Sequence, residues 1–187
     1  MPWGLIITAT IAAVIILWWI GTFNLLNRLK IAITEAWSGI DVQLKRKANI
    51  IPNLVDTLKM QMNFESNLLT ELTAARTGLS SGNRAEAIAA SDKISAMLPK
   101  IQATAENYPQ LGTNASFLKL MEDIRDCEDK IAYARNRYNM TVARFNMTIV
   151  QFPSSIPAGV HHFAAEPLFE ITPAARQDAD EMRISKL

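Results

Sequence analysis

The chain has 187 residues with 19 basic and 18 acidic side chains, a formal net charge of +1 and one cysteine. This balance excludes a global field that would attract nucleic acid or acidic substrates, and one cysteine excludes an intramolecular disulfide and a cysteine-based metal cluster. The length fits one domain with an appendage. No charged side chain precedes Arg28, so the start of the chain differs in character from the rest.

Residues 1–22 are predicted to form a membrane anchor. The stretch from Trp3 to Gly21 is uncharged and mostly apolar, and about twenty residues at about 1.5 Å each span a hydrocarbon core of about 30 Å. Trp3 at one end and Trp18 with Trp19 at the other match the aromatic belt of membrane interfaces. A cleaved signal peptide would need a basic start and a small-residue cleavage site, and neither is present. The other alternative, a buried core helix, rarely runs so long without a charge.

Arg28 and Lys30 predict the orientation of this anchor. The positive-inside rule counts Lys and Arg near the ends of a span, and here they follow the apolar stretch rather than precede it. We therefore expect a single pass with the body of the protein in the cytoplasm. Arg28 and Lys30 are also the expected lipid contacts, because a helix would place Lys45 about 30 Å from the membrane, well beyond a Debye length of about 10 Å.

Residues 23–153 are predicted to be all-α, with four long helices in an antiparallel bundle. The first apolar stripe steps by three and four, and it comprises Leu26, Leu29, Ile33, Ala36, Ile40 and Leu44. A second stripe runs from Ile51 to Leu79, and a third helix runs from about Arg84 to Asn107. The fourth and clearest helix runs from Phe117 to Phe152, where Pro153 ends it. Each stripe needs a partner, and short connections favour a bundle.

Pro52 predicts the junction between the first two helices. The residue before a proline is disfavoured in the α region, so a kink or break is expected near Ile51. Cations suit the last turn of one helix, and proline suits the first turn of the next. The residues assigned to this junction are Asp41, Leu44, Lys45, Arg46, Pro52 and Asn53. Pro99 is likewise expected to kink or divide the third helix.

Residues 154–187 are predicted to be a proline-containing tail. Phe163, Leu168, Phe169 and Ile171 are expected to form a short extended packing segment. From Ala174 the composition becomes polar and of mixed charge, which by itself indicates a flexible end. Docking onto the bundle, or onto a neighbouring copy, would order it.

Candidates for chemistry are few. His161 and His162 are adjacent rather than three or four residues apart on one helical face, so surface histidines are favoured over metal ligands. Cys127 lies on the apolar stripe, which favours a core thiol over a nucleophile. The acidic run around Glu122 and Asp126 lacks the Glu-x-x-His pattern of di-iron bundles, so solvated ion pairs are preferred. We predict no catalytic residue, no cofactor and no metal.

Polar residues on the apolar seams are assigned to helix register. The predicted seam network comprises Glu65, Arg76, Arg135 and Asn139. The alternative is a surface for single-stranded nucleic acid, because arginines and aromatic residues alternate between Asp129 and Asn146. Tyr138 and Phe145 are seven residues apart on the seam, which favours a core role and helix register.

Several short blocks follow one another in a specific order. They are Ala36-Trp37, Ile40-Asp-Val-Gln-Leu-Lys-Arg-Lys47, Ile51-Pro-Asn-Leu-Val55, Thr73-Ala-Ala-Arg76, Glu106-Asn-Tyr-Pro109, Asn114 with Phe117 and Leu120, Ala134-Arg-Asn-Arg-Tyr-Asn139, and Phe145-Asn146 through Phe152-Pro153. In this order they resemble the LemA family of bacterial membrane proteins, from about Phe23 to Phe169. Lys47 and Asn49 depart from the pattern, and the tail after Phe169 has no match.

The resemblance implies a single-pass protein of the bacterial plasma (inner) membrane that carries a long four-helix bundle of coiled-coil type, with no established enzymatic activity. We predict a non-enzymatic, membrane-anchored scaffold that contacts lipid, self-assembles into a homo-oligomer and presents a surface to protein partners, but not to nucleic acid. The alternative is a regulatory adaptor subunit of a membrane enzyme, such as a protease or a sensor kinase. An enzyme would require a pocket of convergent titratable groups that the sequence does not display.

Overall fold

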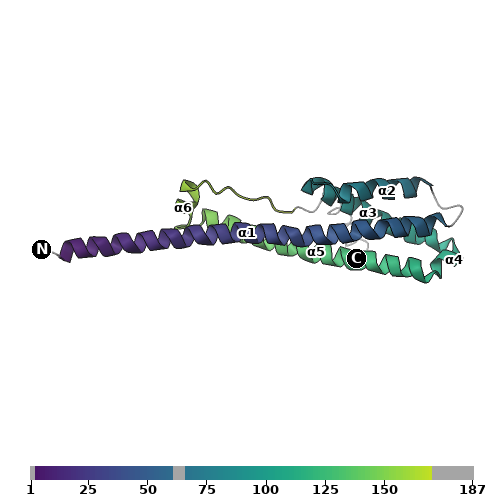
Figure 1. The fold of residues 1–187 in the computed structure, drawn as a ribbon, viewed down its shortest axis with the longest axis horizontal. Coiled ribbons are helices and arrows are strands. Elements are labelled where there is room, and N and C mark those ends of the chain that lie inside the picture. The colour runs from purple at the N-terminus through teal and green to yellow at the C-terminus, as the bar shows by residue number, and fades with distance from the viewer. Residues whose placement is uncertain (1–2, 61–65, 170–187) are drawn as a thin grey trace, which may run out of the picture. The chain divides into compact units, whose positions relative to one another are not determined.

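The chain is built of helices (Figure 1). The computed structural model describes residues 3–60 and 66–169, and every regular element in these ranges is a helix. The elements are α1 (Trp3–Lys59), α2 (Ser66–Leu79), α3 (Arg84–Glu106), α4 (Pro109–Gly112), α5 (Ala115–Val150) and α6 (Ser155–Val160). The predicted all-α class is therefore confirmed for the described residues, whereas the antiparallel arrangement of four helices stays a prediction.

Packing divides the chain into two units. Residues 1–36 and 135–187 form unit 1, and residues 37–134 form unit 2. Helices α1 and α5 contribute to both units, α6 belongs to unit 1, and α2, α3 and α4 belong to unit 2. The predicted domain boundaries after residues 22 and 153 stay predictions.

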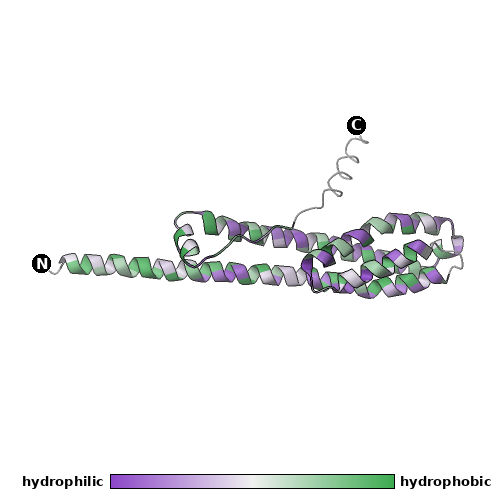
Figure 2. Cartoon of the chain, turned by 90° about the horizontal axis from the view of Figure 1, so that it is seen from above, coloured by the Kyte–Doolittle hydropathy of each residue, from purple (hydrophilic) through white to green (hydrophobic). Residues whose placement is uncertain are grey.

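The first part of α1 is an exposed apolar helix. By length and composition, α1 is able to cross a membrane, and none of its most apolar window is buried. Figure 2 shows hydrophobic residues on all sides of this stretch. Ile11 and Leu17, for example, are 54% and 69% exposed. A core helix would bury such side chains, so the core-helix alternative is excluded within this chain.

The core of unit 1 forms where the apolar stripe of α1 begins. Its buried side chains include Leu26, Leu29 and Ile33 from α1 and Tyr138, Val142 and Phe145 from α5. Their spacing of three and four places them on one face of each helix. Burial of each large apolar side chain contributes about 1.5–3 kcal/mol relative to exposure, so this face holds α1 and α5 in unit 1.

The core of unit 2 draws on five helices, among them the short α4, which contributes the buried Leu111. Its buried side chains include Ile40, Leu44 and Leu54 from α1, Leu68, Leu72 and Leu79 from α2, Ile94 and Ile101 from α3, and Phe117, Ile124 and Ile131 from α5. Helices α2 and α3 approach closely at Gly78, where an added Cβ would lie 2.7 Å from the Cβ of Ala90. Between them, the Asn83 side chain caps α3 by accepting a hydrogen bond from the Ala85 N–H at 2.9 Å.

Pro52 does not break α1, so the predicted helix junction is wrong. The helix runs through Pro52 to Lys59, and the next helix begins only at Ser66. Proline removes the N–H that would bond to the Ala48 carbonyl, and Arg76 Nε of α2 donates to that oxygen instead, at 3.4 Å. Buried apolar residues on both sides of Pro52 also hold the backbone helical. Tertiary contacts thus overcome a local helix breaker.

The other proline predictions have mixed outcomes. Helix α3 spans Pro99, so the predicted division of the third helix is wrong. Helix α5 ends at Val150, just before Pro153, in agreement with the predicted end of the fourth helix. Residues 163–169 form no helix or strand, and Phe163 and Phe169 are half-buried. Ile171 and the stretch from Ala174 lie outside the described residues.

Candidate functional site

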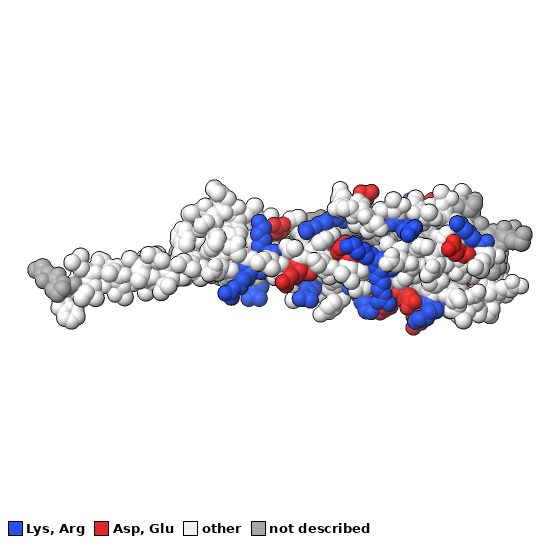
Figure 3. All heavy atoms as spheres, viewed as in Figure 1, with Lys and Arg blue, Asp and Glu red and all other residues white. Residues whose placement is uncertain are grey.

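The residues predicted to anchor the chain lie on the first half of α1. Trp3 is 76% exposed, whereas Trp18 and Trp19 are half-buried, with ring centroids 6.4 Å apart in an edge-to-face arrangement. Arg28 and Lys30 are exposed. On the face shown in Figure 3, the described N-terminal stretch carries no charged side chain before the first basic residues. The anchor residues therefore have the distribution that a membrane span and its flank require.

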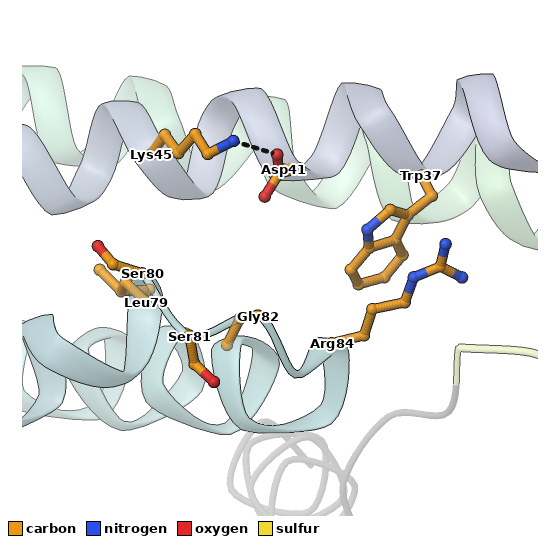
Figure 4. Close-up of a pocket in the computed structure, with 9 residues that line it drawn as sticks. Trp37, Asp41, Lys45, Leu79, Ser80, Ser81, Gly82 and Arg84 are labelled. Carbon is orange, nitrogen blue, oxygen red and sulfur yellow. Dashed lines mark hydrogen bonds and ion pairs between the residues drawn. The ribbon is translucent and has the colours of Figure 1, made fainter.

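A cavity of about 330 Å³ opens in unit 2 between α1 and the turn that joins α2 to α3. Trp37, Asp41 and Lys45 line it from α1. Figure 4 shows Trp37 and Asp41 pointing toward the turn, while Lys45 extends along α1 toward Asp41. The remaining lining residues are Leu79, Ser80, Ser81, Gly82, Arg84 and Ala87. Two residues of the predicted junction, Asp41 and Lys45, therefore lie at a cavity instead of at a helix end.

The charges at this cavity have partners within the chain. The Arg84 guanidinium lies 4.6 Å from the centre of the Trp37 ring, which is a cation–π geometry. Lys45 Nζ lies 2.7 Å from Asp41 Oδ2, and the Ser81 hydroxyl donates to the Glu86 carboxylate. The charged groups at the opening are therefore already paired with other side chains.

Lys47, two residues after Lys45 on α1, is fully buried. Its ammonium donates to the Ser91 carbonyl at 2.8 Å and to Ser95 Oγ at 3.1 Å, and it forms an ion pair with Glu128. Ser91 and Ser95 lie on α3 and Glu128 lies on α5, so one side chain ties three helices together. A buried ammonium without such partners would be strongly destabilising.

This role was not predicted, because Lys47 follows Lys45 and Arg46 in a run of three cations, which usually faces solvent. A signal was present, however. Lys47 is three residues after Leu44 and four before Ile51, and both of these are buried. Residues at these spacings share a helical face, so the stripe itself places Lys47 in the core. Leu44 is 1% exposed, as its place on the predicted stripe requires.

Arg46 makes a surface contact with α5. Its Nη1 lies 3.0 Å from Asp126 Oδ2, and Lys130 Nζ lies 2.8 Å from the same oxygen. The hydrogen bond from Lys130 is the main cause that lowers the pKa of Asp126, and the charges of Lys130 and Arg46 act in the same direction. This cluster agrees with the solvated ion pairs predicted for the acidic run. Of the other junction residues, Pro52 is half-buried and Asn53 is exposed.

The predicted seam residues have partners in different units. Arg76 bonds to the Ala48 carbonyl in unit 2. In unit 1, Arg135 lies 4.4 Å from the centre of the Phe169 ring, and Asn139 bonds to the backbone of Phe169. Glu65 lies outside the described residues. The seam residues thus contact backbone groups and an aromatic ring.

Two asparagines of α5 hold the segment that follows α6. Asn139 donates to the Phe169 carbonyl at 2.9 Å and accepts from its N–H at 2.7 Å. Asn146 likewise donates to the Glu166 carbonyl at 2.8 Å and accepts from the Glu166 N–H at 2.9 Å. Seven helical residues rise about 10.5 Å and three extended residues about 10 Å, so both pairs fit one segment that runs antiparallel to α5. This agrees with the short extended packing segment predicted around Phe163 to Phe169, whereas the docking predicted for the end of the tail concerns residues outside the described ones.

The remaining chemical candidates have structural roles. Cys127 is buried, in agreement with the predicted core thiol, and burial raises the pKa of the thiol. Tyr138 and Phe145 are also buried. His161 and His162 are exposed, and no group of three or more metal-ligating side chains gathers within residues 3–60 and 66–169. His161 Nε2 accepts a hydrogen bond from Trp19 Nε1 at 3.2 Å, which the sequence did not indicate.

The comparison with known families covers most of this architecture. The model of the LemA family matches residues 36–182, which contain the cavity, the Lys47 contacts and both asparagine pairs. The chain belongs to the LemA family. Protein LemA of Metamycoplasma hominis is 26% identical to it over 164 residues, which cover 87% of this chain and 75% of that protein.

The LemA match confirms the predicted family but shifts its limits. It begins at residue 36 rather than at Phe23, and it continues to residue 182. The expectation that the tail after Phe169 has no match was therefore wrong. The short motifs on which that expectation rested end near Phe152. For a LemA-family chain, the held segment after α6 is thus part of the common sequence pattern.

Proposed function

We propose that this protein is a non-enzymatic, membrane-anchored scaffold in which an antiparallel bundle of long helices is held at the membrane surface. The observation that carries this proposal is α1 itself. One helix, Trp3–Lys59, begins with an exposed apolar stretch and continues as a stripe buried in both cores. One helix therefore connects the apolar stretch to the cores of both units without an intervening loop.

Arg28 and Lys30 support the proposed sidedness. Both are exposed, and both follow the apolar stretch directly. The positive-inside rule then places the bundle in the bacterial cytoplasm, with the protein crossing the inner membrane once. When fused after Leu187, a reporter that works only in the cytoplasm should be active. If instead only a reporter that works outside the inner membrane is active, the proposed orientation is wrong.

Exposed apolar residues on α5 support self-assembly. Met140 and Met147 are 67% and 63% exposed and lie seven residues apart, so they share a helical face. Met is common on surfaces that adapt to protein partners. We therefore propose a homo-oligomer formed through this face. The protein mass of the full chain in mild detergent, after subtraction of the detergent, should be two or more times the mass of one protomer. The double variant Met140→Glu with Met147→Glu should have the mass of a single protomer.

The membrane anchor is tested separately. The full chain should stay with the membrane pellet after an alkaline carbonate wash and move to the supernatant only with detergent. A chain with Ile7→Lys and Ile11→Lys should appear in the wash, because a cation at the centre of a span costs about 2.5–3.5 kcal/mol on the insertion scale. Release of the unaltered chain by carbonate would refute the anchor.

A regulatory adaptor is the second candidate, and the cavity at Trp37 favours it. The lining combines the indole of Trp37 with the guanidinium of Arg84, and Trp and Arg are enriched at protein interfaces. We propose that a polar segment of one membrane-enzyme partner would dock there as a one-to-one subunit. A heterologous complex that Trp37→Ala and Arg84→Ala abolish, while Asn53→Ala leaves it intact, would favour the adaptor. Self-association alone would favour the scaffold.

A further inference from the structure

A second uncharged stretch lies near the end of α5. Between Arg144 and Glu166 the chain carries no Asp, Glu, Lys or Arg. This stretch contains the end of α5, the turn after it and all of α6. The first uncharged stretch ends at Arg28. Two segments far apart in the sequence therefore share the same lack of charge, although charged residues make up 20% of the chain.

Unit 1 brings these two stretches together. Trp19 Nε1 donates to His161 Nε2 at 3.2 Å, and the His161 ring lies 4.5 Å from that of Phe23. Phe163 then contacts Phe23 and Phe145, with centroid distances of 6.1 and 6.3 Å. These contacts hold the end of α6 against α1 at the level of Trp19 and Phe23, and Figures 1 and 2 both show α6 beside α1.

That level corresponds to the edge of the hydrocarbon. From Trp3, Trp19 is about 24 Å and Phe23 about 30 Å along the helix, and a hydrocarbon core is about 30 Å thick. A span that starts at Trp3 therefore places Trp19, and with it His161, at the inner interface. Arg28 lies about one turn further on, among the headgroups.

The turn presents large apolar side chains to its surroundings. Val150, Phe152, Ile156 and Val160 are 72%, 77%, 48% and 58% exposed. Pro157 and Ala158, by contrast, are buried against the rest of unit 1. The short helix α6 thus has an inner side fixed to the protein and an outer side that is apolar and uncovered, which Figure 2 shows as hydrophobic colour on α6. Contiguous exposed apolar residues of this kind mark interaction surfaces.

We propose that the turn formed by residues 150–160 inserts into the membrane interface beside the anchor, as a second lipid contact. The occupant is lipid because the turn is continuous with the anchor through Trp19 and His161, and because no charge would have to be desolvated. Arg144, which lies on α5 before this turn, stays on the side of the headgroups. This inference rests on the proposed membrane anchor, and it adds a contact that limits the rotation and tilt of unit 1 at the membrane.

The test places an environment-sensitive fluorophore on single added cysteines in the full chain, in vesicles of phosphatidylcholine and phosphatidylglycerol. Phe152→Cys and Val160→Cys probe the turn, and Ile11→Cys probes the anchor. Tyr133→Cys is the control on the same helix α5, since Tyr133 is 73% exposed and lies further from the turn than the proposed Met140 and Met147 face. The unaltered protein, whose Cys127 is buried, measures background labelling. Quenchers are lipids that carry a doxyl group either near the headgroup or near the end of the acyl chain.

We expect probes at 152 and 160 to show blue-shifted emission and stronger quenching by the shallow quencher, while the probe at 133 is quenched by neither. The probe at 11 should respond most to the deep quencher. Quenching at 11 without quenching at 152 and 160 would overturn the insertion and leave the anchor intact. Absence of quenching at 11 would overturn the anchor. Blue-shifted but unquenched emission at 152 and 160 would overturn the lipid contact, because protein, such as a second copy, would then cover the turn.

Discussion

Lys47 allows the sharpest test of how unit 2 is held together. The change is Lys47→Met, which keeps the length and the helix propensity of the side chain but removes its charge. The variant loses the ion pair with Glu128 and the hydrogen bonds to the Ser91 carbonyl and to Ser95 Oγ. The matched control is Lys45→Met, two residues away on the same helix.

The magnitude follows from burial. Removal of one partner of a buried ion pair costs about 3–5 kcal/mol, because the other charge is left without compensation. The Lys47 side chain is 0% exposed but that of Glu128 is 27% exposed, so water can partly solvate the carboxylate. We therefore expect a loss of about 3 kcal/mol in the free energy of unfolding. The control removes an exposed pair, Lys45 with Asp41, and should cost less than about 1 kcal/mol.

Urea unfolding of the full chain in mild detergent, followed by far-UV circular dichroism, measures both values. The double variant Lys47→Met with Glu128→Gln should be more stable than the sum of the two single losses predicts, since neither charge then remains unpaired. Equal losses for Lys47→Met and Lys45→Met, or strict additivity in the double variant, would refute the reasoning. Either result would mean that the contribution of Lys47 to the free energy of unfolding does not come from its ion pair with Glu128.

Three other contacts allow tests of their own. Arg76→Met should lower the free energy of unfolding by about 1 kcal/mol. The loss should be smaller in a Pro52→Ala background, because the backbone N–H of residue 52 then bonds to the Ala48 carbonyl. An equal loss in both backgrounds would contradict the role of Arg76 as partner of that carbonyl. Asn146→Ala removes both bonds to the backbone of Glu166 and should speed exchange of that amide about tenfold or more by mass-resolved hydrogen exchange, and unchanged exchange would contradict the pairing. The pKa of Asp126 is lowered, so its ionised form contributes stability that is present above its ordinary pKa of 3.8 and is lost as pH falls through the lower folded value. Carboxyl-carbon NMR should give a midpoint below 3.8, and the variant Asp126→Asn should lose less stability on acidification than the unaltered chain; a midpoint at or above 3.8 would sink this prediction.

The predictions that held are those that depend on periodicity over many residues. The stripe from Leu26 to Leu44 is buried at every position, because each apolar side chain on a face adds to the same preference. Pro52 shows the opposite case. Its local preference against helix is real, but Arg76 from another helix satisfies the freed carbonyl. A contact between residues 28 positions apart cannot be read from local sequence.

The candidate sites divide in the same way. The sequence identified Asp41 and Lys45 as part of a motif. They line a cavity with Arg84 only because the α2–α3 turn lies opposite them, which the sequence does not show. The contact of His161 could not be read from the sequence, because its partner, Trp19, is 142 residues away. Asn139 and Asn146 hold a segment whose path follows only from the turn after α5.

The amino-acid sequence by itself determined the helical class, the apolar start and the positions of the buried faces. These depend on the order of apolar and polar residues along one helix, and that order is local information. Only the tertiary structure decided which polar groups meet: the ammonium of Lys47 with Glu128, the guanidinium of Arg76 with a proline-freed carbonyl, and the imidazole of His161 with the indole of Trp19. Such pairs form because burial makes an unpartnered polar group costly, and burial is a property of the assembled helices.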